Sequence, residues 1–290
     1  MQVKLASKRG FCFGVEDAIE LAETTLAKRA GPSDNPQPPQ PLYALGPLIH
    51  NNQVCDKLAD RGLLISELDN IPDGQTVLIR SHGVNPETYD AINARRLNYV
   101  DATCVLVKKA QNCVRQLHEE GYQVVMVGDP NHAEVKGVLG YAPGIICVET
   151  TEDVHKVPKF GKLGIVAQTT HSAEYFSTVV AAIIAQRPFR EIKIVNTLCL
   201  EVVRRQQAAL ELAKEVDVMF VLGGLHSANT KEMARLVRDQ TGVPTYHLET
   251  WEQFEREMIA GCQTAGVTAG ASTPEWVIEE FVSRLKALSG

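Results

Sequence analysis

The sequence lacks the features that mark three common classes of protein. No stretch approaches about 18 consecutive apolar residues, so no membrane span is expected. The first nine residues lack the apolar core of a secretory signal. No block of basic residues occurs and the formal net charge is −6, which argues against nucleic-acid binding. These absences predict a cytoplasmic protein with neither a membrane nor a nucleic acid as its partner.

The cysteine spacings of zinc sites and disulfide frameworks are also missing. The chain has seven cysteines, an odd number, and none forms a Cys-x-x-Cys or Cys/His pair with structural-zinc spacing. Cys55, Cys113, Cys147 and Cys262 are predicted to be ordinary core residues. The other three have a shared context that needs a separate explanation.

What the sequence does contain is an alternation of short β-branched runs with helical patterns, typical of an α/β fold with mostly parallel sheets. Residues 31–41 hold five prolines and predict an exposed loop. The predicted strands are residues 2–5, 76–80, 99–101, 123–127, 164–167, 193–195, 216–222 and 266–268. The predicted helices are residues 15–29, 105–120, 173–186, 201–216, 231–240 and 275–288.

A weak internal repeat surrounds Cys12, Cys104 and Cys199. The first two are separated by 92 residues and the last two by 95 residues. Each follows a short predicted strand and directly precedes a predicted amphipathic helix. This pattern predicts three similar α/β units around a pseudo-threefold axis, with the cysteines at the centre. The expected units are residues 1–102 with Cys12, residues 103–197 with Cys104, and residues 198–290 with Cys199.

Three cysteines at helix starts favour an iron–sulfur cluster. A helix N-terminus stabilises the thiolate, which is the form that binds metal. Three thiolates would hold a [4Fe-4S] cluster and leave one iron open for an exchangeable ligand. A single buried core cysteine is the better interpretation of each position alone, but the repeated context favours the cluster for all three together.

Polar loops follow most of the predicted strands, at the edge where parallel α/β sheets bind ligands. Their imidazoles, hydroxyls, amide and glycine N–H groups suit a small anion such as a diphosphate, although Lys and Arg are scarce there. If the histidines bind phosphate in protonated form, binding should weaken above a pH of about 6.5. The loops are residues 46–51, 81–84, 128–134, 168–170, 223–230 and 269–274.

Two residues in these loops have competing interpretations. Glu134 could relay a proton to a leaving hydroxyl, but its spacing alone favours a solvated loop glutamate. Ser272 precedes Thr273 and Pro274, so it could cap a helix, bind phosphate, or do both.

Together these segments resemble the LytB/IspH family, the hydroxymethylbutenyl diphosphate reductases of the non-mevalonate isoprenoid pathway. The resemblance covers almost the whole chain, from Arg-Gly-Phe-Cys-Phe-Gly-Val at residues 9–15 to Gly-Ala-Ser-Thr-Pro at residues 270–274. It includes residues 46–51, 81–84, 101–104 and 168–170.

The resemblance implies three α/β units around one [4Fe-4S] cluster with Cys12, Cys104 and Cys199 as ligands. It implies reductive removal of the allylic hydroxyl of 4-hydroxy-3-methylbut-2-enyl diphosphate, giving isopentenyl and dimethylallyl diphosphates. Glu134 would deliver the proton, helped by Thr169, and a ferredoxin or flavodoxin would supply electrons one at a time. The implied diphosphate contacts are His50, His82, His132, Ser227, Asn229 and Ser272.

The sequence departs from the family pattern at five positions. Val105 and Ala133 replace prolines, and Ala228 replaces a serine. After Cys199, Glu201 and Val202 replace the alanine and threonine of a Cys-x-Ala-Thr-x-x-Arg-Gln pattern. A lost hydrogen bond to a charged group costs on the order of 1.5–3 kcal/mol. Glu201 would repel nearby phosphates, or serve as a second proton donor beside a cluster.

Three functions therefore remain open. The first is the reductase itself. The second is a paralogue with the same cluster and fold that acts on a different allylic or phosphorylated substrate, favoured by the altered helix after Cys199. The third is a non-catalytic redox or iron sensor, against which Glu134 and Thr169 argue because a sensor needs no proton relay.

Overall fold

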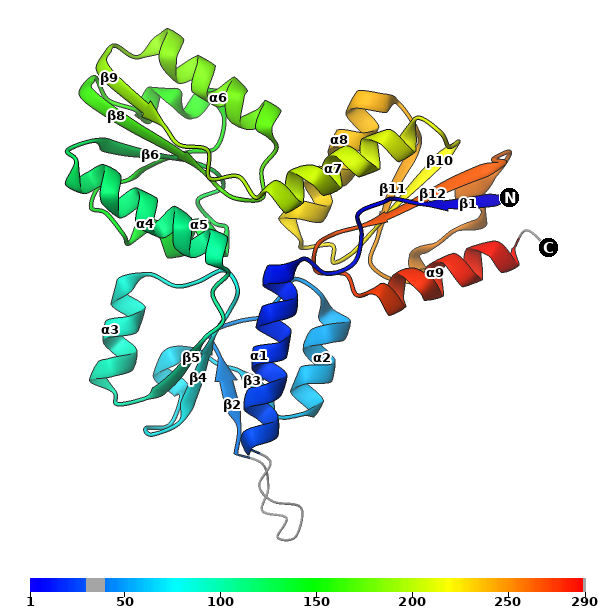
Figure 1. The fold of residues 1–290 in the computed structure, drawn as a ribbon, viewed down its shortest axis with the longest axis horizontal. Coiled ribbons are helices and arrows are strands. Elements are labelled where there is room, and N and C mark those ends of the chain that lie inside the picture. Colours follow the sequence, from blue (N-terminus) through cyan, green and yellow to red (C-terminus); the bar gives the residue numbers. More distant parts are fainter. Residues whose placement is uncertain (30–39, 289–290) are drawn as a thin grey trace. The chain divides into compact units, whose positions relative to one another are not determined.

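The computed structural model describes residues 1–29 and 40–288, which form three four-stranded parallel sheets with flanking helices (Figure 1). The predicted α/β fold of three similar units is confirmed. The proline-rich loop predicted at residues 31–41 lies outside the described residues, apart from its last two. Among the helices of the described chain, none is both long enough and apolar enough to cross a membrane.

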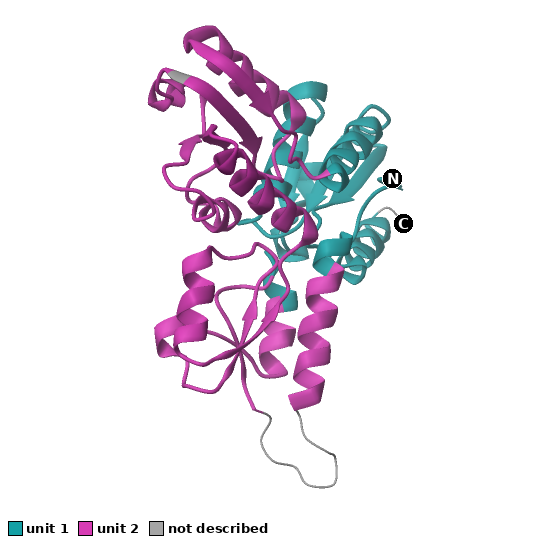
Figure 2. Cartoon of the chain, turned by 60° about the vertical axis from the view of Figure 1, so that its left-hand side comes forward, with its two compact units in different colours: residues 1–15, 49–54, 200–290 teal, residues 16–48, 55–199 magenta. Residues whose placement is uncertain are grey.

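The chain divides into two compact units, coloured separately in Figure 2. The first unit comprises Met1–Val15, Ile49–Val54 and Leu200–Gly290, and contains one sheet. Its strands, in spatial order, are β1 (Gln2–Leu5), β12 (Thr264–Ala269), β10 (Val218–Leu222) and β11 (Thr245–Leu248). Its helices are α7 (Leu200–Ala213), α8 (Ala228–Thr241) and α9 (Glu275–Ala287), with 3-10 turns at Trp251–Gln253 and Arg256–Ile259.

Alternation along β10 builds both sides of this unit's core. Val218 and Phe220 pack in a cluster with residues of α9, whereas Met219 and Val221 pack with residues of α7 and α8. Successive side chains of a strand point to opposite faces, so a continuous apolar strand is buried on both sides. The sheet is therefore covered by helices on both faces, and its loop edges remain available for ligands.

The second unit comprises Glu16–Leu48 and Cys55–Cys199 and holds the other two sheets. One sheet has the order β3 (Leu63–Ile65), β2 (Leu42–Ala44), β4 (Thr76–Ile79) and β5 (Asn98–Asp101). The other has the order β7 (Ile146–Val148), β6 (Gln123–Val127), β8 (Phe160–Ala167) and β9 (Phe189–Ile194). Four helices lie wholly in this unit: α3 (Pro86–Ala94), α4 (Val105–Glu119), α5 (Ala133–Leu139) and α6 (Ala173–Gln186). Two more start in the first unit and continue into the second, namely α1 (Phe13–Arg29) and α2 (Asn52–Asp60). The second unit also has 3-10 turns at Leu68–Asn70 and Thr151–Lys156.

All three sheets share one topology, and the N-terminus completes the third. In the sheets that begin with β2 and β6, the four strands follow one another along the chain and take the spatial order second, first, third, fourth. The remaining sheet has the same arrangement when β10, β11 and β12 are counted as its first, second and third strands and β1 as its fourth. The assignment of the N-terminal strand to residues 1–102 is therefore wrong, because β1 pairs in parallel with β12 from Gln2–Thr264 to Leu5–Val267.

Candidate active site

The three cysteines of the internal repeat occupy equivalent places in the three sheets. Each follows the fourth strand of its sheet and directly precedes a helix, since α1, α4 and α7 begin at the next residue. Each backbone N–H donates to a carbonyl two residues after the end of the third strand. The acceptors are Ala271 for Cys12 (3.1 Å), Ser81 for Cys104 (3.0 Å) and Thr169 for Cys199 (2.8 Å).

This shared setting suits metal ligands. A thiolate at the first turn of a helix lies near the positive end of the helix dipole and near backbone N–H groups. Cysteine thiolates are the ligands of iron–sulfur clusters, and donors close to the sulfur tune such groups. Each of the three cysteines is therefore chemically suited to serve as one ligand of an iron–sulfur group.

Glu134 is a buried acid near the start of α5. Its side chain is 1% exposed. Oε1 accepts a hydrogen bond from the N–H of Thr169 (2.8 Å), and Oε2 accepts one from Thr169 Oγ1 (2.7 Å). Burial raises the pKa of Glu134, and the two bonds from Thr169 partly oppose that rise. The interpretation of Glu134 as a solvated loop residue is therefore wrong, because its carboxyl group is buried against Thr169.

Thr169 links this acid to a cysteine. The carbonyl of Thr169 accepts the bond from the N–H of Cys199, while its own N–H and hydroxyl hold Glu134. One residue thus fixes the carboxyl group and the backbone of a candidate ligand together. This arrangement ties a buried carboxyl group to the backbone of Cys199 through one residue.

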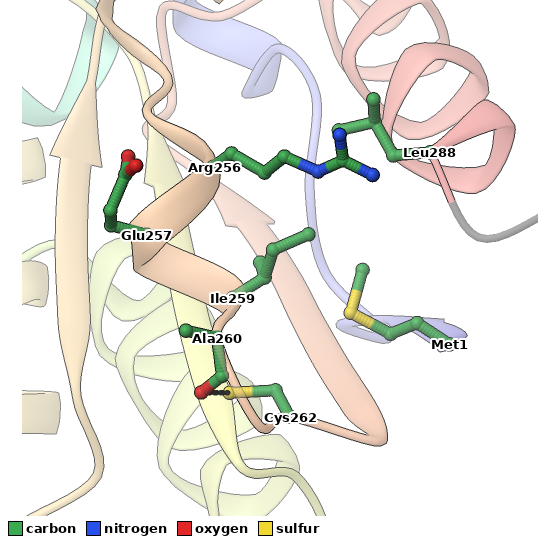
Figure 3. Close-up of a pocket in the computed structure, with 7 residues that line it drawn as sticks. All are labelled: Met1, Arg256, Glu257, Ile259, Ala260, Cys262 and Leu288. Atoms are coloured by element: carbon green, nitrogen blue, oxygen red, sulfur yellow. Dashed lines mark hydrogen bonds between the residues drawn. The ribbon is translucent and has the colours of Figure 1, made fainter.

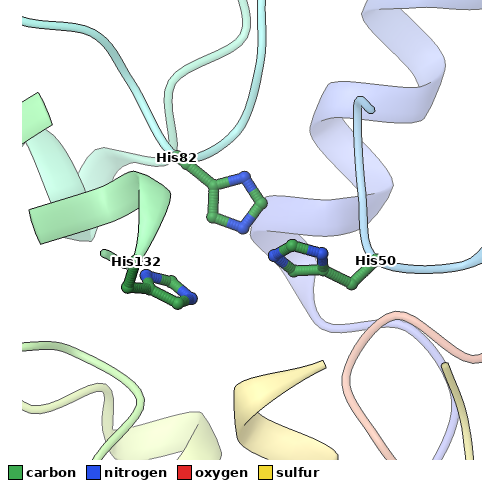
Figure 4. A group of neighbouring side chains, drawn as sticks. All are labelled: His50, His82 and His132. Atoms are coloured by element: carbon green, nitrogen blue, oxygen red, sulfur yellow. The ribbon is translucent and has the colours of Figure 1, made fainter. Parts of the chain in front are cut away.

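His132 caps α5 as a neutral imidazole. Its Nδ1 accepts a bond from the N–H of Glu134 (3.2 Å), so in the neutral ring the proton lies on Nε2. Burial lowers the pKa of His132 to about 4, Asp129 opposes this, and His171 and Arg80 add to it. Its ring meets that of His82 edge to face, with centroids 5.7 Å apart (Figure 4). The expectation that a protonated imidazole binds the anion does not hold for His132, which offers a neutral N–H donor.

We expect His132 to titrate near pH 4, well below the ordinary value of about 6.5. Because the unfolded chain takes up this proton first, His132 should reduce the free energy of unfolding as pH falls from about 6.5 to 4. NMR titration of the imidazole C–H signals measures the pKa. In urea unfolding, His132→Asn should lose less stability over this interval, since asparagine can still cap α5. A His132 midpoint near 6.5 would contradict the assignment.

The polar loops of the first unit meet through backbone and hydroxyl groups. Ser272 Oγ donates to the carbonyl of His50 (3.1 Å), and a Cβ on Gly224 would lie 2.5 Å from the same oxygen. Ser272 does not cap α9, because the N-cap position is Pro274 and no side chain caps it. The helix-cap interpretation of Ser272 is therefore wrong.

Ser227 and Asn229 lie at the start of α8. Ser227 caps the helix by accepting from the N–H of Thr230 (3.3 Å) and from its hydroxyl (2.9 Å). Asn229 is 7% exposed, yet neither Nδ2 nor Oδ1 has a hydrogen-bond partner within residues 1–29 and 40–288. A buried amide without partners costs about 1–3 kcal/mol per group, which a polar ligand would relieve.

Arg205 is a buried cation that sequence analysis left without a role. It lies on α7, is 3% exposed, and donates from Nη1 to the carbonyl of Gly10 (2.8 Å) and from Nη2 to that of Phe11 (2.9 Å). Gly10 adopts a φ of +74°, a left-handed conformation that favours glycine. Arg205 therefore clamps the two residues that precede Cys12. An Arg-Gln pair at residues 205–206 of the helix after Cys199 was the only sequence signal for it.

Replacing Arg205 with methionine should loosen the Cys12 loop. We expect the free energy of unfolding to fall by about 2 kcal/mol, because two carbonyls lose a charged donor. The amide of Cys12, which donates to Ala271, should exchange with deuterium at least about tenfold faster. Arg204→Met is the matched control, since this neighbour is exposed and should stay within about 0.5 kcal/mol of the parent chain. Unchanged exchange at Cys12 in Arg205→Met would show that the clamp is unimportant.

The substituted Glu201 lies beside Cys12. Its carboxylate pairs with Arg204 (2.9 Å), and it lines an open cavity of about 590 Å³ together with Cys12 and Arg205. The residues that line this cavity include none of Ser227, Asn229 and Ser272. Within the first unit, Glu201 is thus grouped with a candidate metal ligand and not with the candidate diphosphate loops. The neighbouring Val202 is buried, so an apolar side chain suits this position, where the family pattern has threonine.

A second cavity, of about 430 Å³, holds none of the predicted site residues (Figure 3). Its lining includes Met1, Arg256 and Cys262, whose thiol donates weakly to the carbonyl of Ala260 (3.9 Å). We assign it no role in the site.

The fold and these contacts define a class of protein. It is a parallel α/β protein of three sheets, with a cysteine at a helix start beside each sheet. A buried glutamate is hydrogen-bonded to the residue that anchors the backbone of one of these cysteines. The chain belongs to the LytB family, whose model, described as LytB protein, matches residues 3–286.

Several relatives cover nearly its full length. The chain is 41% identical over 293 residues to the 4-hydroxy-3-methylbut-2-enyl diphosphate reductase of Aquifex aeolicus (strain VF5), covering 99% of this chain and 97% of the relative. It is 43% identical over 291 residues to the enzyme of the same name from Geobacter sp. (strain M21), covering 99% and 98%.

Two solved structures are also similar. One is an (E)-4-hydroxy-3-methyl-but-2-enyl diphosphate reductase, described as the terminal enzyme of the non-mevalonate pathway, with 41% identity and a TM-score of 0.71 over 99% of this chain and 100% of the other. The second is the E-1-hydroxy-2-methyl-but-2-enyl-4-diphosphate reductase from Plasmodium falciparum, with 30% identity and a TM-score of 0.90 over 98% and 87%.

Proposed function

We propose that this chain is an oxidoreductase that removes the allylic hydroxyl of 4-hydroxy-3-methylbut-2-enyl diphosphate and yields isopentenyl and dimethylallyl diphosphates in the non-mevalonate pathway. The substrate comes from the names of the relatives. The observation that supports the chemistry most directly is the buried Glu134, held by Thr169 next to the backbone of Cys199. Reductive loss of a hydroxyl needs such a proton source.

We assign the cofactor as one [4Fe-4S] cluster held by Cys12, Cys104 and Cys199, with one iron open. The support is the identical setting of the three residues, each at a helix start and each anchored through its N–H. When bound, such a cluster supplies electrons and a Lewis-acidic iron to the substrate hydroxyl.

The loop side chains would bind and orient the diphosphate. His132 offers Nε2–H as a neutral donor, which keeps binding possible above pH 6.5. Asn229 offers a buried amide without a protein partner among the described residues. The hydroxyl of Ser272 donates to the backbone of His50, and Ser227 caps α8, so both would also serve the loops themselves. The proposed contacts are His50, His82, His132, Ser227, Asn229 and Ser272.

Glu134 would hold and deliver the proton. Its raised pKa keeps the carboxyl group protonated further toward neutral pH, and the departing hydroxyl takes that proton to leave as water. Thr169 fixes the orientation of the carboxyl through two hydrogen bonds. The two electrons required would come one at a time from a ferredoxin or flavodoxin, and a second proton must add to the allylic carbon to complete either product. The cytoplasmic location stays a prediction from the sequence.

Anaerobic assay of the iron-loaded protein tests this function. With reduced methyl viologen and 4-hydroxy-3-methylbut-2-enyl diphosphate, we expect both isopentenyl and dimethylallyl diphosphates. Iron and sulfide content and the visible spectrum must be recorded on the same sample. Absence of turnover with an intact cluster would reject the reductase and leave the paralogue, which a screen of other allylic diphosphates addresses.

A further inference from the structure

Arg80 is a half-buried arginine of the second unit whose guanidinium group lacks a partner. Its buried Nε has no hydrogen-bond acceptor, and the group makes no ion pair or other hydrogen bond within the part of the chain that the structure describes. Two other half-buried arginines of this unit do have acceptors: Arg95 donates to two backbone carbonyls and Arg187 to one. A desolvated charge without a partner is unfavourable, so an anionic ligand would stabilise the guanidinium of Arg80.

Arg80 lies at the edge of its sheet where parallel strands present ligand-binding loops. It directly follows β4, which pairs with β2, and Gly46 lies two residues after the end of β2. A Cβ on Gly46 would be 2.7 Å from Nη1 of Arg80, so the guanidinium rests against this glycine, whose φ is +116°. The hydroxyl of Ser81 donates to the carbonyl of Leu48 (3.1 Å) and ties the same two loops together. The guanidinium is therefore held between two loops at the carboxyl ends of adjacent strands.

Two proposed phosphate contacts of the second unit lie near this cation. His82 comes two residues after Arg80, and its ring meets that of His132. The charge of Arg80 is one of the causes that lower the pKa of His132. Burial lowers the pKa of Arg80 itself, and Glu67 opposes this, as Asp129 does for His132. Both carboxylates act from a distance, because neither is within ion-pair range of the guanidinium of Arg80.

We infer that Arg80 binds a phosphate group of the substrate together with the imidazoles of His82 and His132. A guanidinium presents planar N–H donors that match two phosphate oxygens, and it stays charged at neutral pH. Arg80 would supply the positive charge that the polar loops lack, since residues 46–51, 81–84, 128–134, 168–170, 223–230 and 269–274 contain no lysine or arginine. That the phosphate belongs to a diphosphate substrate rests on the proposed function, whereas an anion at Arg80 is inferred from its unpaired guanidinium.

Binding of inorganic pyrophosphate to the anaerobic, iron-loaded protein, measured by calorimetry, tests the inference. Arg80→Met should weaken binding at least about tenfold, because a charged donor pair is lost. Arg80→Lys keeps the charge but loses the planar fork, so it should weaken binding about threefold. Arg190→Met is the matched control: Arg190 is exposed near the amino end of β9, at the opposite edge of its sheet, and its replacement should leave binding unchanged.

Turnover and stability separate a binding role from a structural one. In Arg80→Met the KM for 4-hydroxy-3-methylbut-2-enyl diphosphate should rise about tenfold, while kcat should stay within about threefold of the parent. This split is expected because the hydrogen bonds that hold Glu134 come from Thr169 and do not involve Arg80. The urea midpoint of unfolding should not fall, since methionine removes an unpaired charge and retains most of the packing volume.

Unchanged pyrophosphate affinity in Arg80→Met would overturn the inference, as would an equal loss in Arg190→Met, which would reduce the effect to net charge. A lower urea midpoint in Arg80→Met, with no loss of affinity in Arg80→Lys, would give Arg80 a structural role instead. If Arg80→Met does not fold, the affinity of Arg80→Lys decides alone. Parent protein that binds pyrophosphate through Arg80 but does not turn over the substrate would refute the proposed function and leave Arg80 as an anion contact.

Discussion

Replacing Glu134 with glutamine is expected to lower turnover at least about 100-fold, the lower end of the contribution from acid catalysis. Glutamine matches the shape of glutamate, accepts from the N–H of Thr169 through its oxygen, and donates to Thr169 Oγ1 through its amide. The fold and the anchoring of Cys199 should therefore survive. Turnover assays with reduced methyl viologen, together with the cluster spectrum, give the measurement.

The Glu134→Gln variant should also become more stable relative to the parent as pH rises. Burial raises the folded-state pKa of Glu134, so its contribution to stability is present below the unfolded value of about 4.5 and is lost as pH rises through the folded value. Glutamine does not ionise and avoids that loss. Urea unfolding of the metal-free chains should show the variant gaining on the parent between pH 5 and pH 8. A constant difference in the free energy of unfolding between parent and variant over this pH range would contradict a raised pKa of Glu134 in the folded state.

Thr169→Ser serves as the control for this pair, because serine retains the hydroxyl that donates to Glu134. We expect its turnover to stay within about threefold of the parent, whereas Thr169→Val should fall about tenfold. Near-normal turnover in Glu134→Gln would remove Glu134 from the mechanism. Loss of the cluster in that variant would mean that the residue supports the Cys199 loop and not the proton transfer.

The second large effect is expected from the cysteines. Serine at position 12, 104 or 199 should lower iron content from about four atoms per chain to less than about one, since a cluster on two thiolates is poorly held. Turnover should fall on the order of 100-fold or more, exceeding the cost of losing a group that supports a ligand. Iron and sulfide analysis of anaerobically prepared protein measures the first effect directly.

Cys113→Ser is the matched control. Cys113 lies on α4, the helix that begins directly after Cys104, and burial raises the pKa of its thiol. It has neither the helix-start position nor the N–H contact to a third-strand loop that the other three share. Its replacement should leave iron content unchanged. Retention of a full cluster in any one of the three test variants would exclude that residue as a ligand.

Residue patterns near one another in the chain determined the fold class and most helices. The predicted helix at 173–186 matches α6, and the predicted strand at 123–127 matches β6, because side-chain periodicity is a local property. Short helices escaped detection: α2, α3 and α5 have only seven to nine residues. For α3 a signal was present, since Asn85 accepts from the N–H of Thr88 and Pro86 fills the first turn.

The sequence by itself also revealed the repeat of Cys12, Cys104 and Cys199, because helix starts and strand ends are written locally around each cysteine. Only the tertiary structure decided that β1 completes the sheet of β12, that Glu134 is buried against Thr169, and that Arg205 clamps the Cys12 loop. Strand pairing and burial depend on residues distant in the chain, and the pKa of a side chain follows that burial. Local patterns therefore predicted which residues carry the chemistry, while non-local packing decided the burial and anchoring of the groups proposed to perform it.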